Sequence, residues 1–472
     1  MTVQSKLIDP LCITCKDFQH PWTDKCVNAT AGILLSATPY CLRVYTIVYA
    51  FSLLMRHRVP TLGDLRRTIL GIIQSTAFLV TNAYTFILYN CLLRNLLGRY
   101  YFGTVAFIPS FLSSLTAIIV ERPARRPLLA TYVANVGTEA LWRMAESRNW
   151  VRSIPHGQTL IFAGSIATLL YMYRTSAPKD SIFNILRIFV GKEEAGPIAE
   201  PEPLEAGQQP APARRRPSVC FSSVSDWVRV YSNLIRAKHT SCRHQQSCAA
   251  YAVLGGLRPF VGGVALQVAL KLVMNIKKVA SGKMQWEKHI FNKNTLQLGI
   301  FMGSFSFLYK VTARTQTKVL SLIVFLLLQS VSCLLRHSFN RDQAFYAIPA
   351  GLVASLAFTK YPDNTVALYV MWKALQILGT MGQERGILPH VPHFTLYLYA
   401  FFTAVLFHAG VMESQSLRPN YFKFLQAISG ERQFNLSAFD VFGLNTQQQA
   451  HEMVKSLNIV DKSSLPAFSF AS

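Results

Sequence analysis

Long apolar stretches separated by short charged loops run through almost the whole chain. Each stretch is close to the roughly 20 mostly apolar residues that a membrane-spanning helix needs. The pattern therefore predicts an all-α, polytopic helical membrane protein. Five spans are expected before residue 191: Ala31–Met55, Ile69–Leu93, Tyr101–Val120, Leu128–Met144 and Gln158–Tyr173. Six more are expected after residue 239: Ala249–Met274, Leu296–Thr312, Val319–Leu335, Phe345–Thr359, Thr365–Gly379 and Phe394–Met412.

Two short amphipathic segments, 181–194 and 421–431, each follow one of these series of spans. Each combines apolar residues at helical spacing with a glycine, Gly191 or Gly430, that is typical of a helix end. We therefore predict two related halves of about five spans each, which end in interfacial amphipathic helices. The expected domains are a Cys/His-rich tract at 1–30, a first membrane repeat at 31–191, a disordered basic linker with an interfacial helix at 192–238, a second membrane repeat at 239–431 and a tail at 432–472.

Shared sequence features also indicate the duplication. Cys26 and Cys248 both precede a first span, Tyr89 corresponds to Tyr309, and the Pro-His motif at 154–156 is matched with the one at 388–390. The offset grows from about 220 to about 240 residues, which predicts an insertion near residues 361–374. An odd number of spans per half would make the repeats inverted in the membrane and an even number would make them parallel, and both remain open.

The composition excludes an ordinary set of soluble domains, since 51% of the residues are hydrophobic and only 15% are charged. The formal net charge of +24 comes from Lys and Arg that are concentrated in the loops. We expect these side chains to contact the lipid bilayer through anionic lipids, and we expect no nucleic acid partner. The first 30 residues are polar, so no cleavable signal peptide is expected.

The region 192–225 is rich in Pro, Glu, Gln and Ala, a composition typical of a disordered linker. Within it Ser218 follows the arginines at 214–216 and is a candidate phosphorylation site, where added negative charge would weaken contact with anionic lipid. An unmodified basic linker is the alternative. Trp227 and Tyr231 then begin a segment with the spacing of an interfacial helix.

Polar residues interrupt several predicted spans, and Arg43, Asn135 and Glu139 are the candidates for a functional role inside the membrane. Ionisable groups at bilayer depth are costly, so each should face the bundle interior or a wet cavity, or lie nearer the membrane surface. Glu139 is four residues before Arg143. A local ion pair on one helix face is therefore favoured over a proton relay.

Cysteine and histidine residues near the start of the chain have spacing compatible with a metal site. Cys12, Cys15, His20 and Cys26 could bind Zn²⁺, which takes thiolate and imidazole ligands. The alternative is a set of reduced thiols in a polar loop, with no cofactor. A second, differently spaced set begins the other half: His239, Cys242, His244 and Cys248. The remaining cysteines in apolar segments, Cys41, Cys91 and Cys333, are interpreted as small core residues.

Small residues at four-residue spacing predict close helix packing. Gly299 and Gly303 form a G-x-x-x-G pair, and Gly351 with Ser355 repeats the spacing. No motif of a hydrolase, a metalloprotease or a phosphate-binding loop is found, so we predict that the protein is not an enzyme. His156 and His390 follow prolines at span entrances and are the best candidates for proton transfer, but loop histidines at helix starts are the favoured interpretation.

Several motifs in combination resemble the transmembrane protein 135 family. They are Val190-Gly191-Lys192-Glu193-Glu194, the arginine-containing stretch from Glu121 to Asn135, the N-terminal Cys/His tract and Leu417-Arg418-Pro419-Asn420-Tyr421. The second half is also similar to peroxisomal membrane protein 4, and both families are grouped distantly with the inner-membrane import translocases. The resemblance implies a multi-pass protein of mitochondrial and peroxisomal membranes, linked to mitochondrial fission, fat storage and energy metabolism.

Three functions follow as hypotheses. The first is a non-enzymatic regulator of organelle dynamics that works with other organelle-dynamics proteins. The second is a transporter or channel for a lipid or metabolite, suggested by the internal duplication and the polar residues within spans. The third is a protein-import pore. The sequence leaves the oligomeric state open.

Overall fold

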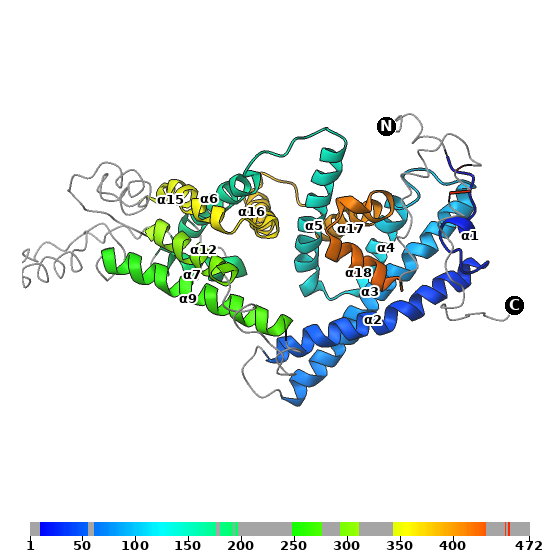
Figure 1. Cartoon of the computed structure of the whole chain (residues 1–472), viewed down its shortest axis with the longest axis horizontal. Helices are drawn as coiled ribbons and strands as arrows, with labels where there is room; N and C mark the ends of the chain where they lie inside the picture. The colour runs from blue at the N-terminus through cyan, green and yellow to red at the C-terminus, as the bar shows by residue number, and fades with distance from the viewer. Residues whose placement is uncertain are drawn as a thin grey trace, which may run out of the picture. The chain divides into compact units, whose positions relative to one another are not determined.

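The computed structural model describes residues 10–54, 61–175, 180–191, 194–196, 248–275, 293–310 and 343–430, together with residues 449, 452 and 453. Within these ranges the regular elements are helices (Figure 1). One isolated antiparallel bridge pairs Leu11 with Tyr100. The predicted all-α class is confirmed. Ser218, the predicted helix at Trp227, the predicted span Val319–Leu335 and all of the linker except residues 194–196 lie outside the described residues.

The described chain forms two compact units. The first contains residues 1–153 and 383–472. In this unit α17 packs against α4 and α5, and α18 packs against α2. Its elements are α1 (Cys15–Phe18), α2 (Cys26–Leu54), α3 (Leu62–Leu97), α4 (Phe107–Val120), η2 (Pro123–Arg125), α5 (Arg126–Ser147), α17 (Phe394–Met412), η5 (Ser414–Ser416) and α18 (Pro419–Ile428).

The second unit contains residues 154–382. In this unit α6 packs against α15 and η4, and α7 packs against α9 and α12. Its elements are α6 (Gly157–Thr175), α7 (Ser181–Val190), α9 (Cys248–Met274), α12 (Lys293–Lys310), η3 (Ala344–Tyr346), α15 (Ala347–Ala354), η4 (Ser355–Lys360) and α16 (Asn364–Glu384).

These units do not coincide with the repeats expected at 31–191 and 239–431. Each unit combines the first helices of one half of the sequence with the last two α-helices of the other half. The first unit receives α17 and α18, and the second receives α6 and α7. The helix order in the two halves agrees with a duplication. The last helix pair of each half, however, packs in the unit that contains the first helices of the other half. Sequence repetition specifies the order of helices and does not specify which copy packs where.

The backbone conformation also corrects the pairing of histidines between the two halves. His156 and His393 both have φ of 60° and directly precede a helix, α6 or α17. Each carbonyl accepts hydrogen bonds from the N–H groups three and four residues on. His393, not His390, is therefore the counterpart of His156. The predicted insertion near residues 361–374 stays a prediction.

Helix ends follow local chemistry. Thr61 and Asp64 form a reciprocal capping box at the start of α3, and Gly98 ends the helix with φ of 70°. At α7 the Asp180 side chain accepts from the N–H of Ile182 at 3.0 Å. Burial raises the pKa of Asp180, but this hydrogen bond and the Lys373 ammonium group 3.3 Å away outweigh burial and hold the pKa below its ordinary value.

Four helices in the described ranges are long and apolar enough to cross a membrane: Cys26–Leu53, Leu62–Leu97, Val253–Leu272 and Phe394–Met412. The other described segments predicted as spans are helical but are shorter or less apolar. For example, α4 has 14 residues. A helix of that length extends roughly 21 Å, against about 30 Å of hydrocarbon.

Large apolar side chains are exposed along three of these helices, on surfaces that lipid tails would cover. They include Leu34, Leu35, Leu42, Ile47, Val48 and Phe51 of α2, Leu65, Ile69, Leu70 and Ile73 of α3, and Val253, Leu257, Val261 and Leu266 of α9. Such surfaces support the assignment of these helices as membrane spans.

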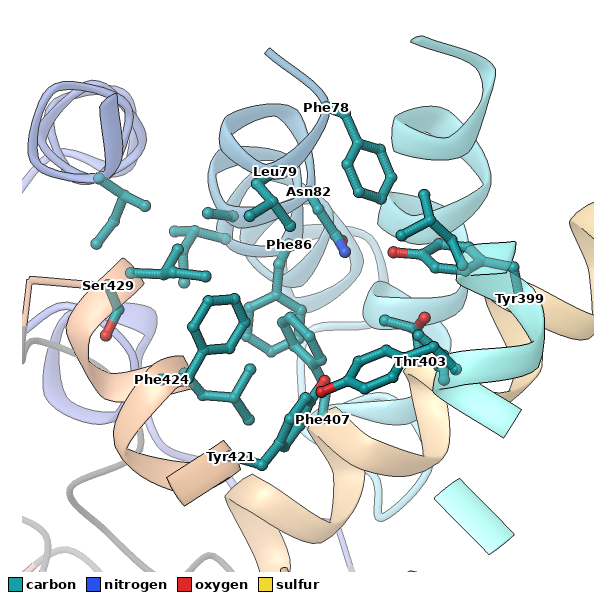
Figure 2. Close-up of a pocket in the computed structure, with 18 of the residues that line it drawn as sticks. Phe78, Leu79, Asn82, Phe86, Tyr399, Thr403, Phe407, Tyr421, Phe424 and Ser429 are labelled. Carbon is teal, nitrogen blue, oxygen red and sulfur yellow. The ribbon is translucent and has the colours of Figure 1, made fainter. Parts of the chain in front are cut away.

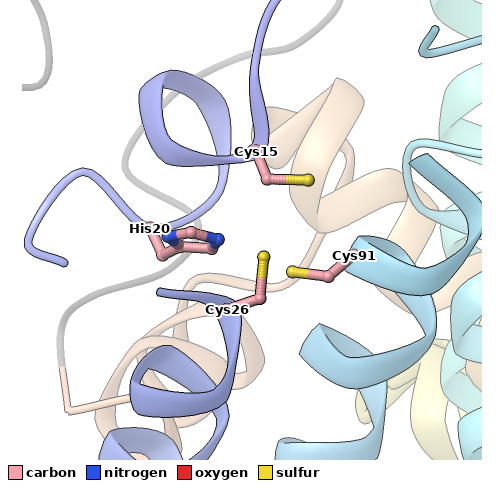
Figure 3. Close-up of side chains that lie close together, drawn as sticks. All are labelled: Cys15, His20, Cys26 and Cys91. Carbon is pink, nitrogen blue, oxygen red and sulfur yellow. The ribbon is translucent and has the colours of Figure 1, made fainter. Parts of the chain in front are cut away.

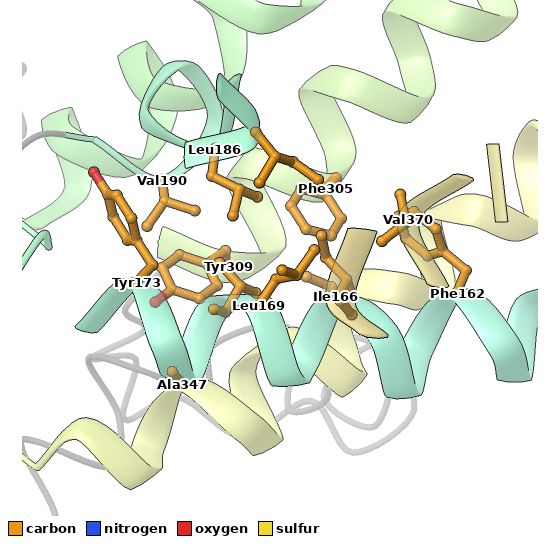
Figure 4. Close-up of a cluster of buried hydrophobic side chains, with 14 of the residues drawn as sticks. Phe162, Ile166, Leu169, Tyr173, Leu186, Val190, Phe305, Tyr309, Ala347 and Val370 are labelled. Atoms are coloured by element: carbon orange, nitrogen blue, oxygen red, sulfur yellow. The ribbon is translucent and has the colours of Figure 1, made fainter. Parts of the chain in front are cut away.

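The core of the second unit surrounds α6 (Figure 4). Phe162 stacks on Phe358 with ring centroids 4.3 Å apart and an interplanar angle of 9°. The apolar face of α7, expected at the membrane interface, contributes Ile182, Phe183, Leu186 and Val190 to this core. The opposite face leaves Ile185 and Ile188 exposed. The main apolar face of α7 therefore packs inside the protein.

Candidate functional site

Three cysteines and one histidine converge where α1, α2 and α3 meet (Figure 3). The Sγ atoms of Cys15, Cys26 and Cys91 and a ring nitrogen of His20 all lie within 4.8 Å of one another. Cys15 begins α1, Cys26 begins α2, and Cys91 lies near the end of α3. The cluster therefore joins the N-terminal segment to the open end of the α2–α3 hairpin.

The N-terminal segment is held at this position by independent contacts. Leu11 and Tyr100 exchange backbone hydrogen bonds of 2.8 and 3.0 Å. Arg94 donates from Nε to the carbonyl of Ile13 at 2.9 Å, and its guanidinium group lies over the Tyr100 ring. The Tyr100 hydroxyl donates to Cys15 Sγ at 3.4 Å. The position of Cys15 is thus fixed from the end of α3.

The His20 ring has a defined orientation. Its Nδ1 lies 2.9 Å from the carbonyl oxygen of Thr23, so Nδ1 carries the proton and donates a hydrogen bond to that oxygen. Nε2 is then the atom with a free lone pair on the cluster side. At Cys15, a hydrogen bond from the Cys91 thiol outweighs partial burial and holds the thiol pKa well below its ordinary value.

The membership of this cluster differs from the sequence prediction. Cys15, His20 and Cys26 come together as expected, but Cys12 is exposed and lies outside the group. Cys91, interpreted above as a small core residue, takes the fourth position. The correction has a geometric cause: an antiparallel helix hairpin brings the end of α3 back to the start of α2. Of the second Cys/His set, His239, Cys242 and His244 lie outside the described residues, and nothing is described of the Cys248 side chain.

The turn between α4 and α5 contains a dense polar network. Glu121 is 1% exposed, and its carboxylate accepts from Ser75 Oγ at 3.3 Å and from the N–H of Arg122 at 2.9 Å. Arg125 pairs with Glu121 at 3.3 Å and donates to the Tyr49 hydroxyl at 2.8 Å. The network therefore ties α2 and α3 to the turn between α4 and α5.

Two further arginines of this turn have internal partners. Arg122 donates to Gln74 Oε1 at 2.7 Å. Arg126 donates to the carbonyls of Ile119 and Glu121, at the end of α4. These loop arginines, which were expected to contact anionic lipid, also stabilise the turn. For them and for the exposed Arg66 and Arg67, contact with anionic lipid stays a prediction.

Glu139 lies at the junction of two ion pairs in the first unit. It pairs with Arg143 at 2.6 Å, as the spacing predicted. It also accepts from Nε of Arg418 at 2.6 Å, a contact between α5 and the start of α18 that the sequence did not indicate. Asn135, one turn earlier, is 2% exposed.

Arg43 does not face the bundle interior. The buried face of α2 carries Ile33, Ala37 and Cys41, which follow one another at four-residue steps. Arg43 is two residues beyond Cys41, about 200° around the helix, and is exposed.

A cavity of about 150 Å³ lies inside the first unit, lined by residues of α2, α3, α5, α17 and α18 (Figure 2). Its walls are mostly aromatic and aliphatic, with Phe78, Phe86 and Phe424 among them. No acidic, basic, histidine or cysteine side chain is among its lining residues. The Thr403 hydroxyl also lines it, and among the described residues this buried oxygen has no hydrogen-bond partner.

The glycines singled out for packing lie at close helix contacts. A Cβ at Gly299 would fall 2.5 Å from a Val264 side-chain atom, and one at Gly303 would fall 2.7 Å from Cβ of Phe260. Both contacts are between α12 and α9. A Cβ at Gly351 of α15 would fall 3.0 Å from Cα of Ala167 of α6.

The apolar helices and the internally paired charges define a multi-pass helical membrane protein. Residues 12–146 match the family model described as the N-terminal cysteine-rich region of Transmembrane protein 135. Over this region the chain is similar to the transmembrane protein 135 family. The matched region includes the whole Cys/His cluster and the Glu121 network. No solved structure matches the chain. The similarity of the second half to peroxisomal membrane protein 4 stays a prediction.

Proposed function

We propose that this chain is a non-enzymatic, multi-pass protein of the mitochondrial and peroxisomal membranes that regulates mitochondrial fission and the lipid and energy metabolism of these organelles. The similarity of residues 12–146 to the transmembrane protein 135 family supports this proposal. The exposed apolar faces of α2, α3 and α9 support its position in a bilayer.

The structural observation that carries the lipid part of the proposal is the cavity in the first unit. A mostly apolar cavity of about 150 Å³ accommodates a group about as large as a benzene ring. That is enough for one segment of an acyl chain or one ring of a larger lipid. The Thr403 hydroxyl offers a hydrogen bond to one polar atom of such a ligand. The walls contain no charged group that would favour a charged metabolite.

Filling the cavity tests this proposal. Ala83 lines it from α3, whereas Ile73 of the same helix is exposed away from it. In cells that lack the protein, we expect wild type and Ile73→Phe to restore mitochondrial length and neutral-lipid stores. Ala83→Leu should reach the membrane in equal amount and restore neither. Full rescue by a folded Ala83→Leu protein would contradict a role for the cavity.

The alternative is a transporter for a lipid or metabolite, and the same cavity is the observation that favours it. Flux across liposomes containing the purified protein alone separates the two functions. Lipid flux that Ala83→Leu lowers and Ile73→Phe leaves unchanged would favour transport. No flux over a panel of lipids, with rescue of mitochondrial length retained in cells, would favour the regulator.

A further inference from the structure

The four ligand atoms of the Cys/His cluster have nearly the separations of a metal centre. Tetrahedral zinc binds cysteine sulfur at about 2.3 Å and histidine nitrogen at about 2.0–2.1 Å, so its ligand atoms lie about 3.5–3.8 Å apart. The corresponding atoms of Cys15, His20, Cys26 and Cys91 are within 4.8 Å of one another. Small side-chain rotations would close the difference. The three sulfur atoms point toward a common centre (Figure 3).

The His20 ring supplies a second, independent observation. The residue is fully buried, and among the described residues its Nε2 has no hydrogen-bond partner. A buried ring nitrogen without a close partner is costly, and a weak thiol donor would relieve that cost less than a bound metal ion would. Donation from Nδ1 to the carbonyl of Thr23 is also the hydrogen bond that usually orients a metal-bound histidine.

The surroundings suit thiolate ligands. Three thiolates around one Zn²⁺ leave one negative charge. The guanidinium group of Arg94 lies close by, on the face of the Tyr100 ring. The Tyr100 hydroxyl donates to Cys15 Sγ, a hydrogen bond that orients this ligand sulfur.

We propose that Cys15, His20, Cys26 and Cys91 bind one Zn²⁺ ion as a closed structural site. Four protein ligands fill a tetrahedral shell and leave no position for a substrate, so the ion stabilises the fold and performs no catalysis. It fastens the N-terminal segment and the first residue of α2 to the end of α3. This site goes beyond the proposed function and does not depend on it.

The test is the metal content of the full-length protein purified in detergent under reducing conditions. We expect one zinc ion per chain by elemental analysis. When the proteins are equilibrated with a chelator that competes for zinc, Cys91→Ser should lower this content by about tenfold or more, because even loss of a hydrogen bond to a ligand costs about 10–100-fold in affinity. Cys12→Ser and Cys41→Ala are the matched controls, one an exposed thiol outside the cluster and one a buried thiol elsewhere on α2. Both should keep the metal.

Cobalt substitution of the wild-type protein provides a test that does not rely on a variant that folds. Co²⁺ exchanged into the site should give the absorption bands of a tetrahedral centre with thiolate ligands, and added Zn²⁺ should abolish them. The proposal is overturned by wild-type protein that binds neither Zn²⁺ nor Co²⁺, by a native disulfide within the cluster, or by full zinc content in Cys91→Ser.

Discussion

The carboxylate of Glu139 receives guanidinium groups from two directions, Arg143 on its own helix and Arg418 at the start of α18. Its side chain is only 9% exposed, so a single surface-type pair would not offset the cost of burying the charge. The second pair, with Arg418, offsets the cost of burying the carboxylate and holds the start of α18 against α5. A structural ion pair explains this position without proton transfer.

We predict that Arg418→Gln lowers the stability of the protein by about 1–3 kcal/mol, because Glu139 then keeps only its partly exposed partner. The measurement is thermal unfolding in detergent. The control is Glu146→Gln, which removes an exposed carboxylate from the same helix. Equal stability of the two variants would show that the Arg418 contact contributes nothing. In the double variant Glu139→Gln with Arg418→Gln, the effects should be less than additive.

At the scale of the helix pair, α9 and α12 approach so closely that backbone atoms form part of the contact. A Cβ at Gly263 of α9 would fall 2.8 Å from Cα of Gly299 of α12. Membrane helices gain no hydrophobic stabilisation from leaving lipid, so they depend on such close packing. The glycines on both helices permit it.

We predict that Gly303→Ala destabilises the protein by about 1–3 kcal/mol, since its Cβ would fall 2.7 Å from Cβ of Phe260 and 3.1 Å from the carbonyl oxygen of Gly256. The matched control is Gly164→Ala in α6, where the added Cβ meets nothing within 4 Å. That change should stabilise by about 0.5–1 kcal/mol, because glycine inside a helix costs conformational entropy. Thermal unfolding of both variants measures the difference. The packing argument fails if the two shifts have the same sign.

At the scale of the whole chain, the exchange of the last helix pairs makes the two halves of the sequence depend on each other. Arg148 of the first half pairs with Glu413 of the second half within the first unit. Asp180 of the first half pairs with Lys373 of the second half within the second unit. Neither half contains a complete compact unit.

We therefore predict that residues 1–210 and 230–472, produced together as separate chains, bind each other and purify as one complex. Each chain produced alone should be unstable, because its last two helices lack the helices of the other chain against which they pack. The measurement is recovery of the untagged chain with the tagged one after detergent extraction. Double variants that reverse the Asp180–Lys373 pair, Asp180→Lys with Lys373→Asp, should still associate. Stable separate chains that do not associate would contradict the exchange.

The sequence predicted the helical class, the span Phe394–Met412, a span at Ala31–Met55 that overlaps the observed Cys26–Leu53, and the glycine ends of α7 and α18, because these depend on local hydropathy and backbone preference. It predicted three of the four clustered Cys/His residues, because Cys15, His20 and Cys26 are neighbours along the chain. Cys91 could have been found from the predicted hairpin, since antiparallel spans return residue 91 to the level of residue 26.

Apolar length, charge placement and helix-end residues act within a single helix, and the sequence by itself therefore determined that this chain forms a series of apolar helices. Only the tertiary structure decided that α17 and α18 complete the first unit and that Arg418 reaches Glu139. These outcomes depend on which distant surfaces pack best together. Contacts between residues hundreds of positions apart leave no periodic signal in the sequence.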